Sequence, residues 1–275
     1  MSWCALDILA GPTERSRIAA WLVQRTGQSV VEHDDGSLLG VAPEEHASSL
    51  LLDLQGAFGT DVQATTRVLP EQDWNQLWRT GLGPRRIGRL IVTPSWALPE
   101  TTESPTVVID PQTAFGTGEH GSTRTALTLL NRFVRPGMRV VDLGSGSGIL
   151  AIAALKLGAS RALAVDIDPE AEPIARENAD RNGVADRVVF FTGDAAALAE
   201  LLGPAELVLS NILRTQNVSL LPRIGSMLAP GGIAIFAGME PEERELFLSA
   251  LAEHGLIIRD EAVDEGWWGV AVSPG

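Results

Sequence analysis

The chain has 275 residues with a formal net charge of −14, a hydrophobic fraction of 45% and one cysteine. This length suits one large or two modest domains, and the acidic balance argues against direct recognition of nucleic acid and favours a basic protein partner. The single cysteine excludes an internal disulfide, no apolar run approaches the ~20 residues of a membrane span, and the first residues lack a signal-peptide pattern, so we expect a cytoplasmic protein.

Short strand and helix patterns alternate through residues 1–69. Their hydrophobic spacing predicts the order β-α-β-β-α-β, the ferredoxin-like arrangement, with a hairpin turn in the Asp-Asp-Gly segment 34–36. His33 and His46 are isolated, and we interpret them as surface residues. Residues 1–69 are therefore predicted to form a ferredoxin-like domain that recognises the substrate. Its strands are expected at 3–9, 29–33, 37–42 and 62–69 and its helices at 12–24 and 43–54.

We predict a linker over residues 70–106. Its first part has a helix pattern with Trp74, Leu77 and Trp78 on one face, and its last part has a short strand and a proline-rich turn. Three arginines lie between these parts. They form either a solvated basic segment against an acidic neighbouring domain or a binding patch. These residues are Arg85, Arg86 and Arg89.

A short strand runs into a glycine-rich loop in the segment 107–123. The glycines allow close approach of the backbone, and Phe115 offers a ring face for packing on a ligand. Ser122 or Thr123 is expected to cap the helix that follows. The segment is either a capped helix with a glycine loop or a lid over a cofactor, and we favour the lid. For His120, a hydrogen-bonding role is favoured over a role as general base.

The stretch RVVDLGSGSGIL, residues 139–150, predicts a strand, a tight glycine turn and a helix. Gly144 and Gly146 would let the chain turn sharply and let a ligand lie against bare main chain. This GxGxG spacing differs from the GxGxxG fingerprint of dinucleotide-binding folds. Asp142 precedes the turn, and Asp166 ends the next strand, where its carboxylate can accept both ribose hydroxyls of an adenosine. Together these residues favour S-adenosylmethionine over NAD as the cofactor.

Strand and helix patterns alternate regularly from residue 139 onward. The last two strands are joined by the Asp-Glu-Gly segment 264–266, which is too short for a crossover helix, so they must pair antiparallel. A mostly parallel, Rossmann-like sheet with an antiparallel last strand is typical of class I methyltransferases. Residues 107–275 are therefore predicted to form an α/β methyltransferase domain. Its strands are expected at 139–143, 161–166, 187–192, 206–211, 232–238, 256–263 and 267–273.

Two further strand ends complete the predicted site, because ligands gather at the carboxyl ends of parallel strands. Asp194 follows the third strand, where it is either a partner of the adenine amino group or an ordinary helix cap. Asn211 ends the fourth strand, and its amide can accept from or donate to a substrate amine. A turn-forming role is the alternative for Asn211, and its location favours function. No cluster of His, Cys and Asp has metal-ligand spacing, so no metal site is predicted.

Five motifs, in chain order, resemble the PrmA family of bacterial ribosomal protein L-eleven methyltransferases: DPQTAFGTGEHGSTRTAL, DLGSGSGILAIAALKLGA, VDIDPEA, ENADRNGV and SNIL. The resemblance covers nearly the whole chain. It implies S-adenosylmethionine as the methyl donor and lysine side chains and the N-terminal amine of that large-subunit ribosomal protein as acceptors. It also implies that the N-terminal domain holds the protein substrate.

The resemblance assigns roles to individual residues. Four residues match cofactor contacts of the family, namely Thr123, Gly144, Asp166 and Asn211, while Phe115 and Thr117 match the loop that folds over the cofactor. Separately, the location of Asn211 at its strand end predicts that it is the catalytic residue: water, or Asn211 with nearby main-chain carbonyls, would select the lone pair of the acceptor amine.

The chain departs from the family pattern in three places. Glu-His-Gly-Ser-Thr at 119–123 replaces Thr-His-Pro-Thr-Thr, Arg-Thr-Gln at 214–216 replaces Ala-Gly-Pro, and the N-terminal domain is short. Residues 214–216 border the expected place of the acceptor amine. The first alternative is therefore a methyltransferase that acts on another protein or a small amine. The second is a non-catalytic, cofactor-binding module that docks on ribosomes.

Overall fold

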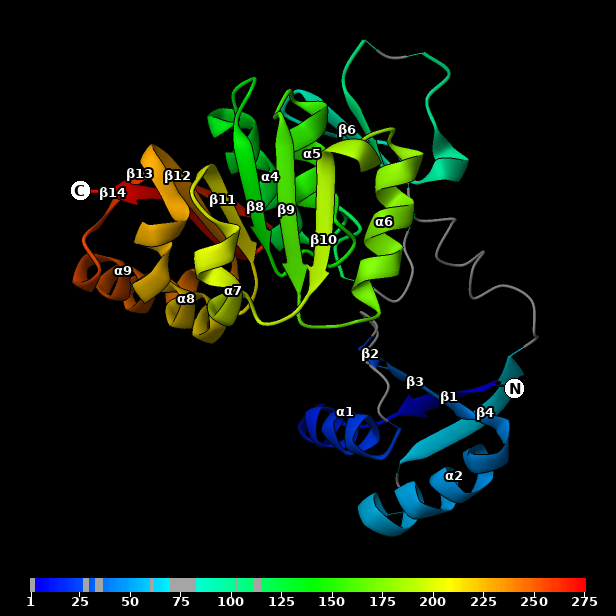
Figure 1. Cartoon of the computed structure of the whole chain (residues 1–275). Coiled ribbons are helices and arrows are strands. Elements are labelled where there is room, and N and C mark those ends of the chain that lie inside the picture. The colour runs from blue at the N-terminus through cyan, green and yellow to red at the C-terminus, as the bar shows by residue number, and fades with distance from the viewer. Residues whose placement is uncertain are drawn as a thin grey trace. The chain divides into compact units, whose positions relative to one another are not determined.

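The computed structural model describes residues 3–26, 30–32, 37–59, 62–69, 83–101, 103–110 and 115–275. The chain folds as two compact units, Met1–Gly81 and Leu82–Gly275 (Figure 1). Among the described residues, no helix is both long and apolar enough to cross a membrane.

The first unit is a four-stranded antiparallel sheet with two helices packed against it. Its elements are β1 (Trp3–Leu9), α1 (Pro12–Thr26), β2 (Val31–Glu32), β3 (Ser37–Pro43), α2 (Glu44–Phe58) and β4 (Gln63–Leu69). Side chains alternate along β1, so that Leu6 and Ile8 enter the core, where they pack with Ile18 of α1 and Leu54 of α2. The strand order β2-β3-β1-β4 confirms the ferredoxin-like prediction.

Some expectations for the first eighty residues fall on positions that the structure does not describe. His46 is exposed on α2, as expected. His33, the turn at 34–36 and the helix expected around Trp74 and Trp78 lie outside the described residues.

The second unit is built on a seven-stranded sheet. Its strands are β8 (Arg139–Leu143), β9 (Arg161–Asp166), β10 (Val188–Thr192), β11 (Ala205–Asn211), β12 (Leu228–Met239), β13 (Leu256–Asp264) and β14 (Trp267–Pro274). They lie in the order β10-β9-β8-β11-β12-β14-β13, and the first five of these pair parallel. Strand β14 pairs antiparallel with both β12 and β13, which confirms the predicted class I methyltransferase sheet.

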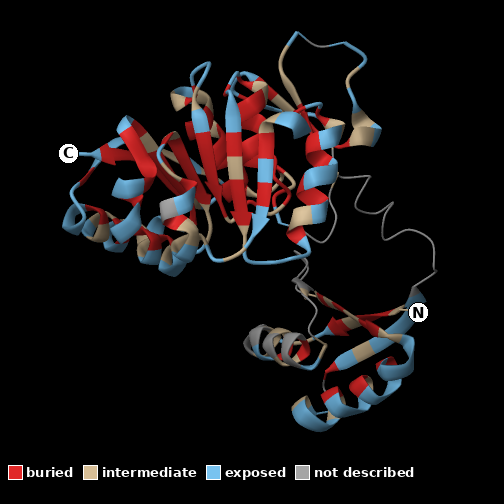
Figure 2. Ribbon diagram, viewed as in Figure 1, coloured by how far each residue is buried: buried red, intermediate tan, exposed pale blue. Residues whose placement is uncertain are grey.

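Helices cover both faces of this sheet, and the central strands between them are almost wholly buried (Figure 2). The helices are α4 (Gly121–Phe133), α5 (Ile149–Lys156), α6 (Ala171–Arg181), α7 (Ala195–Leu202), α8 (Arg214–Met227) and α9 (Arg244–Glu253), with short 3-10 turns at Ser95–Ala97, Ala185–Arg187 and Pro241–Glu243. Successive side chains of β8 enter the cores on opposite faces of the sheet: Val140 packs with α4 and α5, and Val141 packs with α8 and α9. Burial on both faces explains why these strands are continuous apolar runs in the sequence.

A three-stranded sheet precedes α4. It consists of β5 (Arg85–Ile87), β6 (Leu90–Thr93) and β7 (Thr106–Val108), with β5 antiparallel and β7 parallel to β6. Strand β5 is not predicted from the sequence, because three residues are too few for a periodic signal. The apolar side chains of Ile87 and Leu90 join the core that contains α4 and α5. The predicted domain boundaries at 69/70 and 106/107 remain predictions.

Candidate active site

The glycine turn after β8 brings three segments of backbone together. Gly144 and Gly146 have φ values of 75° and 49°, which residues with a side chain rarely adopt. The Gly144 amide donates to the Val165 carbonyl at 2.8 Å. A Cβ atom at Gly144 would overlap Ile212, and one at Gly146 would overlap the carbonyl of Phe115. Both glycines are therefore required by the backbone conformation and by the close packing around the turn.

A cavity of about 500 Å³ lies beside this turn, at the carboxyl ends of β8, β9 and β11. Its size is in the range of small-molecule binding sites. In the described part of the chain, no group of three His, Cys, Asp or Glu side chains could hold a metal ion. The cavity brings together six of the predicted site residues: Phe115, Gly144, Gly146, Asp166, Asp194 and Asn211.

Two carboxylates line the cavity, and both already accept bonds from backbone amides. Asp166 Oδ2 accepts from the Gly146 amide at 2.7 Å, and its Oδ1 accepts from the Asp168 amide at 3.0 Å. Because each carboxylate oxygen has two lone pairs, Asp166 retains acceptor positions for ligand hydroxyls. Asp194 Oδ1 accepts from the Ala196 amide at 2.7 Å and caps α7. Of the two roles considered for Asp194, the structure shows the helix cap. Because Asp194 also lines the cavity, its contact with the adenine amino group remains a prediction.

Asn211 ends β11 and reaches the first turn of α4. Its Nδ2 donates to Oγ1 of the fully buried Thr123 at 3.4 Å. Its Oδ1 is shielded from solvent and has no hydrogen-bond donor among the described residues. A buried acceptor without a donor costs about 1 to 3 kcal/mol. Since Asn211 also lines the cavity, rotation of its amide would present this oxygen to a donor carried by a ligand, which can remove the cost.

The start of α4 differs from the expectation. The helix begins at Gly121 with His120 at the N-cap position, and no side chain caps it. The prediction of Ser122 or Thr123 as the cap is wrong, because both residues lie inside the first helical turn. Ser122 Oγ instead lies 2.8 Å from His120 Nδ1, and the buried Thr123 contacts Asn211.

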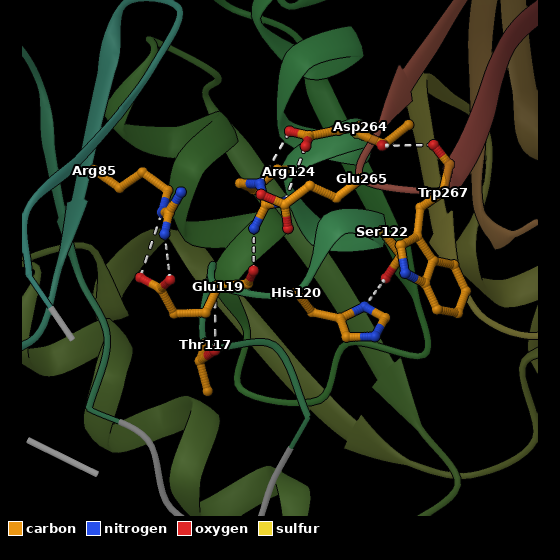
Figure 3. Close-up of polar contacts among 10 residues, drawn as sticks. Arg85, Thr117, Glu119, His120, Ser122, Arg124, Asp264, Glu265 and Trp267 are labelled. Atoms are coloured by element: carbon orange, nitrogen blue, oxygen red, sulfur yellow. Dashed lines mark hydrogen bonds and ion pairs between the residues drawn. The ribbon is translucent and has the colours of Figure 1, made fainter. Parts of the chain in front are cut away.

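Three rings line one side of the cavity, Phe115, His120 and Trp267, and we call them the aromatic wall. The centroid of the His120 ring lies 5.2 Å from that of Phe115 and 4.4 Å from that of Trp267. Figure 3 shows the His120 and Trp267 rings beside each other. Burial, with a further effect of the Arg124 charge, lowers the pKa of His120, so its ring is neutral at pH 7. Trp267 is not predicted from the sequence, because it begins an ordinary strand pattern and only strand pairing brings it to the cavity.

Thr117 is not among the described residues that line the large cavity. Its Oγ1 accepts from the Glu119 amide at 3.2 Å, and it lines a separate small hollow beside Val92. The Glu119 carboxylate pairs with Arg85 at 2.5 Å, so this arginine is bound within its own unit (Figure 3). The contact of Thr117 with a cofactor remains a prediction.

Asp142 lies beneath the glycine turn and is fully buried. Its Oδ2 accepts from the Ala151 amide at 3.0 Å, which fixes the start of α5, while Oδ1 has no donor among the described residues. Burial raises the pKa of Asp142 to about 7, and the nearby Asp166 charge adds to the rise. This carboxyl is therefore poised between its neutral and ionised forms near neutral pH.

Comparison with known proteins agrees with this geometry. The family description "Ribosomal protein L11 methyltransferase (PrmA)" matches residues 23–273. Two proteins named ribosomal protein L11 methyltransferase are each 43% identical to the chain. The one from Pelotomaculum thermopropionicum is matched over 74% of this chain and 66% of its own length, and the one from Thermus thermophilus over 72% and 76%.

The matched part of the chain thus spans 66% of the Pelotomaculum relative's length, slightly less than two thirds. A crystal structure of ribosomal protein L11 methylase from Lactobacillus delbrueckii subsp. bulgaricus superimposes with a TM-score of 0.64 at 33% identity. The superposition covers 70% of this chain and 98% of the chain in that crystal structure. The extent of the family match and these identities lead to one assignment: the chain belongs to the ribosomal protein L11 methyltransferase (PrmA) family.

Proposed function

We propose that the protein transfers methyl groups from S-adenosylmethionine to amines of ribosomal protein L11, a protein of the large subunit. The acceptors are lysine side chains and the N-terminal amine. The observation that carries this proposal is the grouping of the glycine turn, the Asp166 carboxylate and the unsatisfied Asn211 oxygen around one cavity. Family membership supports the same conclusion.

The residues around the cavity fit S-adenosylmethionine. When bound, this cofactor supplies a methyl group activated by a positively charged sulfur. The bare backbone of Gly144 and Gly146 lines the cavity, where a ligand can lie against main chain, and the spare acceptor positions of Asp166 suit ribose hydroxyls. Phe115, which is 55% exposed beside the cavity, can cover the ligand.

The acceptor amine has to be neutral, because a protonated amine has no free lone pair. A lysine amine has a pKa of about 10.4 in water, and desolvation lowers that pKa. The aromatic wall offers such a desolvating surface. Asn211 Oδ1 would accept one N–H of the amine and so aim its lone pair, while the lost proton passes to water. Positioning and desolvation are then the main contributions of the protein.

The test is methyl transfer from labelled S-adenosylmethionine to unmodified L11 and to total ribosomal protein from a strain that lacks the enzyme. We expect label on L11, at lysines and the N-terminal amine by mass spectrometry, at a rate that rises from pH 7 to pH 9. Cofactor binding by calorimetry without label on L11 would contradict the substrate. Absence of cofactor binding would contradict the methyltransferase assignment.

The segment 214–216 favours a second candidate, a methyltransferase for another protein or a small amine. Gln216 lines the cavity, so a polar side chain lies where the family pattern has a proline. Arg214 pairs with Glu243 at 3.1 Å and is not among the described residues that line the cavity. A panel of other ribosomal proteins and small amines separates the two candidates. Cofactor binding without transfer to any member of the panel is the result expected of a non-catalytic module. Because the proposed substrate is a ribosomal protein, we infer a cytoplasmic location.

A further inference from the structure

The aromatic wall is built from two segments that lie far apart in the sequence. Phe115 and His120 belong to the loop before α4, whereas Trp267 begins β14, directly after the turn at 264–266. The rings of His120 and Trp267 are in contact, with centroids 4.4 Å apart. The shape of this side of the cavity therefore depends on how the loop and the turn are held together.

Arg124, in the first turn of α4, contacts both segments (Figure 3). Its guanidinium forms a two-pronged pair with Asp264, with Nε to Oδ2 and Nη2 to Oδ1 distances of 2.9 Å each. Nη2 also lies 2.6 Å from Glu265 Oε2, and Nη1 donates to the carbonyl of Glu119. One side chain thus joins the loop to the turn.

The position of this charge is unfavourable without its partners. A cation in the first turn of a helix lies at the positive end of the helix dipole, and the Arg124 side chain is only 5% exposed. Its hydrogen bonds with Asp264 raise the pKa of Arg124 and lower the pKa of Asp264, so both groups stay charged. Because the guanidinium is buried, loss of its carboxylate partners would leave an uncompensated buried charge, which favours keeping the contacts intact.

Two further contacts hold the segment 264–267 against the start of α4. Thr125 Oγ1 donates to the Trp267 carbonyl at 3.3 Å. At Gly121 the helix backbone approaches so closely that a Cβ atom would overlap the Trp267 ring and the Asp264 carbonyl. The location of the Trp267 ring is therefore fixed relative to the start of α4.

We propose that Arg124 is a positioning residue for the acceptor amine: by joining the loop to the turn, it holds the His120 and Trp267 rings at the spacing that seats the amine beside Asn211. This inference rests on the proposed function, because it concerns the acceptor side of the same cavity. Arg124 is not among the described residues that line the cavity, so it acts through the rings. The glycine turn and Asp166, on the cofactor side, do not depend on it.

The variant Arg124→Gln tests this role, and Arg132→Gln is its matched control. Arg132 lies on the same helix about two turns further along and pairs with Asp260 of β13 at 2.8 Å. For Arg124→Gln we expect kcat/KM for L11 to fall about 10- to 100-fold, mainly through kcat, because small misplacements of reacting groups slow the chemical step. Cofactor affinity by calorimetry should stay unchanged. For Arg132→Gln we expect less than about a twofold change, since exposed pairs contribute little.

Two more variants test whether Arg124 acts through its fork of donors and through the Trp267 ring. Arg124→Lys keeps the charge but not the fork of donors, so an intermediate loss is expected, and it replaces the Gln variant if that one does not fold. If Arg124 acts through Trp267, the double variant Arg124→Gln/Trp267→Ala loses little more than Trp267→Ala alone. Unchanged kcat/KM in Arg124→Gln, or additive losses in the double variant, would overturn the inference. Absence of transfer by the unaltered enzyme would instead contradict the proposed function.

Discussion

The side-chain amide of Asn211 donates to the hydroxyl of Thr123 across 3.4 Å, although 88 residues separate the two in the chain. This contact joins the carboxyl end of β11 to the first turn of α4. Because it engages only Nδ2, the oxygen of the same amide is left without a donor among the described residues. The contact therefore sets the orientation of the Asn211 amide, with its nitrogen toward Thr123.

Replacement of Asn211 by alanine removes this acceptor. We expect kcat for methyl transfer to fall about 100-fold, as for loss of a hydrogen bond that orients a reacting group. Thr123→Val, which removes only the partner of the amide, should cause a smaller loss. Single-turnover kinetics with calorimetry of cofactor binding measures both effects. Full turnover by Asn211→Ala with normal cofactor binding would exclude a catalytic role for this amide.

Neutralisation of Asp166 should weaken cofactor binding. In Asp166→Asn we expect a dissociation constant about 10- to 100-fold higher, because hydrogen bonds to a charged acceptor contribute about 1.5 to 3 kcal/mol. Asp168→Asn is the matched control: it removes an equal charge two residues away, from an exposed carboxylate that accepts from the Glu170 amide at 2.9 Å. Calorimetric titration with the cofactor gives the dissociation constants of the two variants. Equal affinities in the two variants would argue against ribose recognition by Asp166.

Two glycines with similar φ angles allow the effect of backbone strain on stability to be measured separately from the effect of packing. Gly137 has φ 84° and open space around it, whereas Gly144 has φ 75° and Ile212 where a side chain would be. Gly137→Ala should cost about 1 to 2 kcal/mol in the free energy of unfolding, from backbone strain alone. Gly144→Ala should cost more and also abolish cofactor binding. Urea unfolding and calorimetry measure the two, and an equal loss of stability would show that packing around Gly144 is unimportant.

The buried carboxyl of Asp142 should make stability depend on pH. Folding raises its pKa from 3.8 to about 7, so the folded chain holds this proton more tightly than the unfolded chain. The Asp142 contribution to the free energy of unfolding therefore decreases as pH rises between these values, by about 2 to 3 kcal/mol from pH 5 to pH 8. In Asp142→Asn this decrease should be absent. Parallel stability curves of the variant and the unaltered protein would contradict the buried titration.

Local patterns in the sequence predict the sheet well. The three-residue segment 264–266 is enough to predict that the last strand runs antiparallel. The glycine turn at 144–146 can be predicted from the residues directly beside it. The strand ends that carry Asp166 and Asn211 are likewise defined by short apolar runs, so their gathering at one edge follows from parallel pairing.

Features that depend on distant packing are not predictable in this way. The start of α4 is set at Gly121 because only a glycine leaves room for Trp267, and this overrides the capping preference of Ser122 and Thr123. Trp267 and Arg124 acquire their roles through contacts between segments about 140 residues apart. Such contacts leave no periodic trace in the sequence.

The pairing of Arg124 with Asp264 also has a consequence for the order of events during synthesis. The ribosome adds the aspartate 140 residues after the arginine, a delay on the order of ten seconds at usual translation rates. A nascent chain can assemble β8, β9 and the glycine turn in that interval, while the guanidinium still lacks its carboxylate. The Arg124–Asp264 pair can therefore form only after the residues of β8, β9 and the glycine turn have all been synthesised.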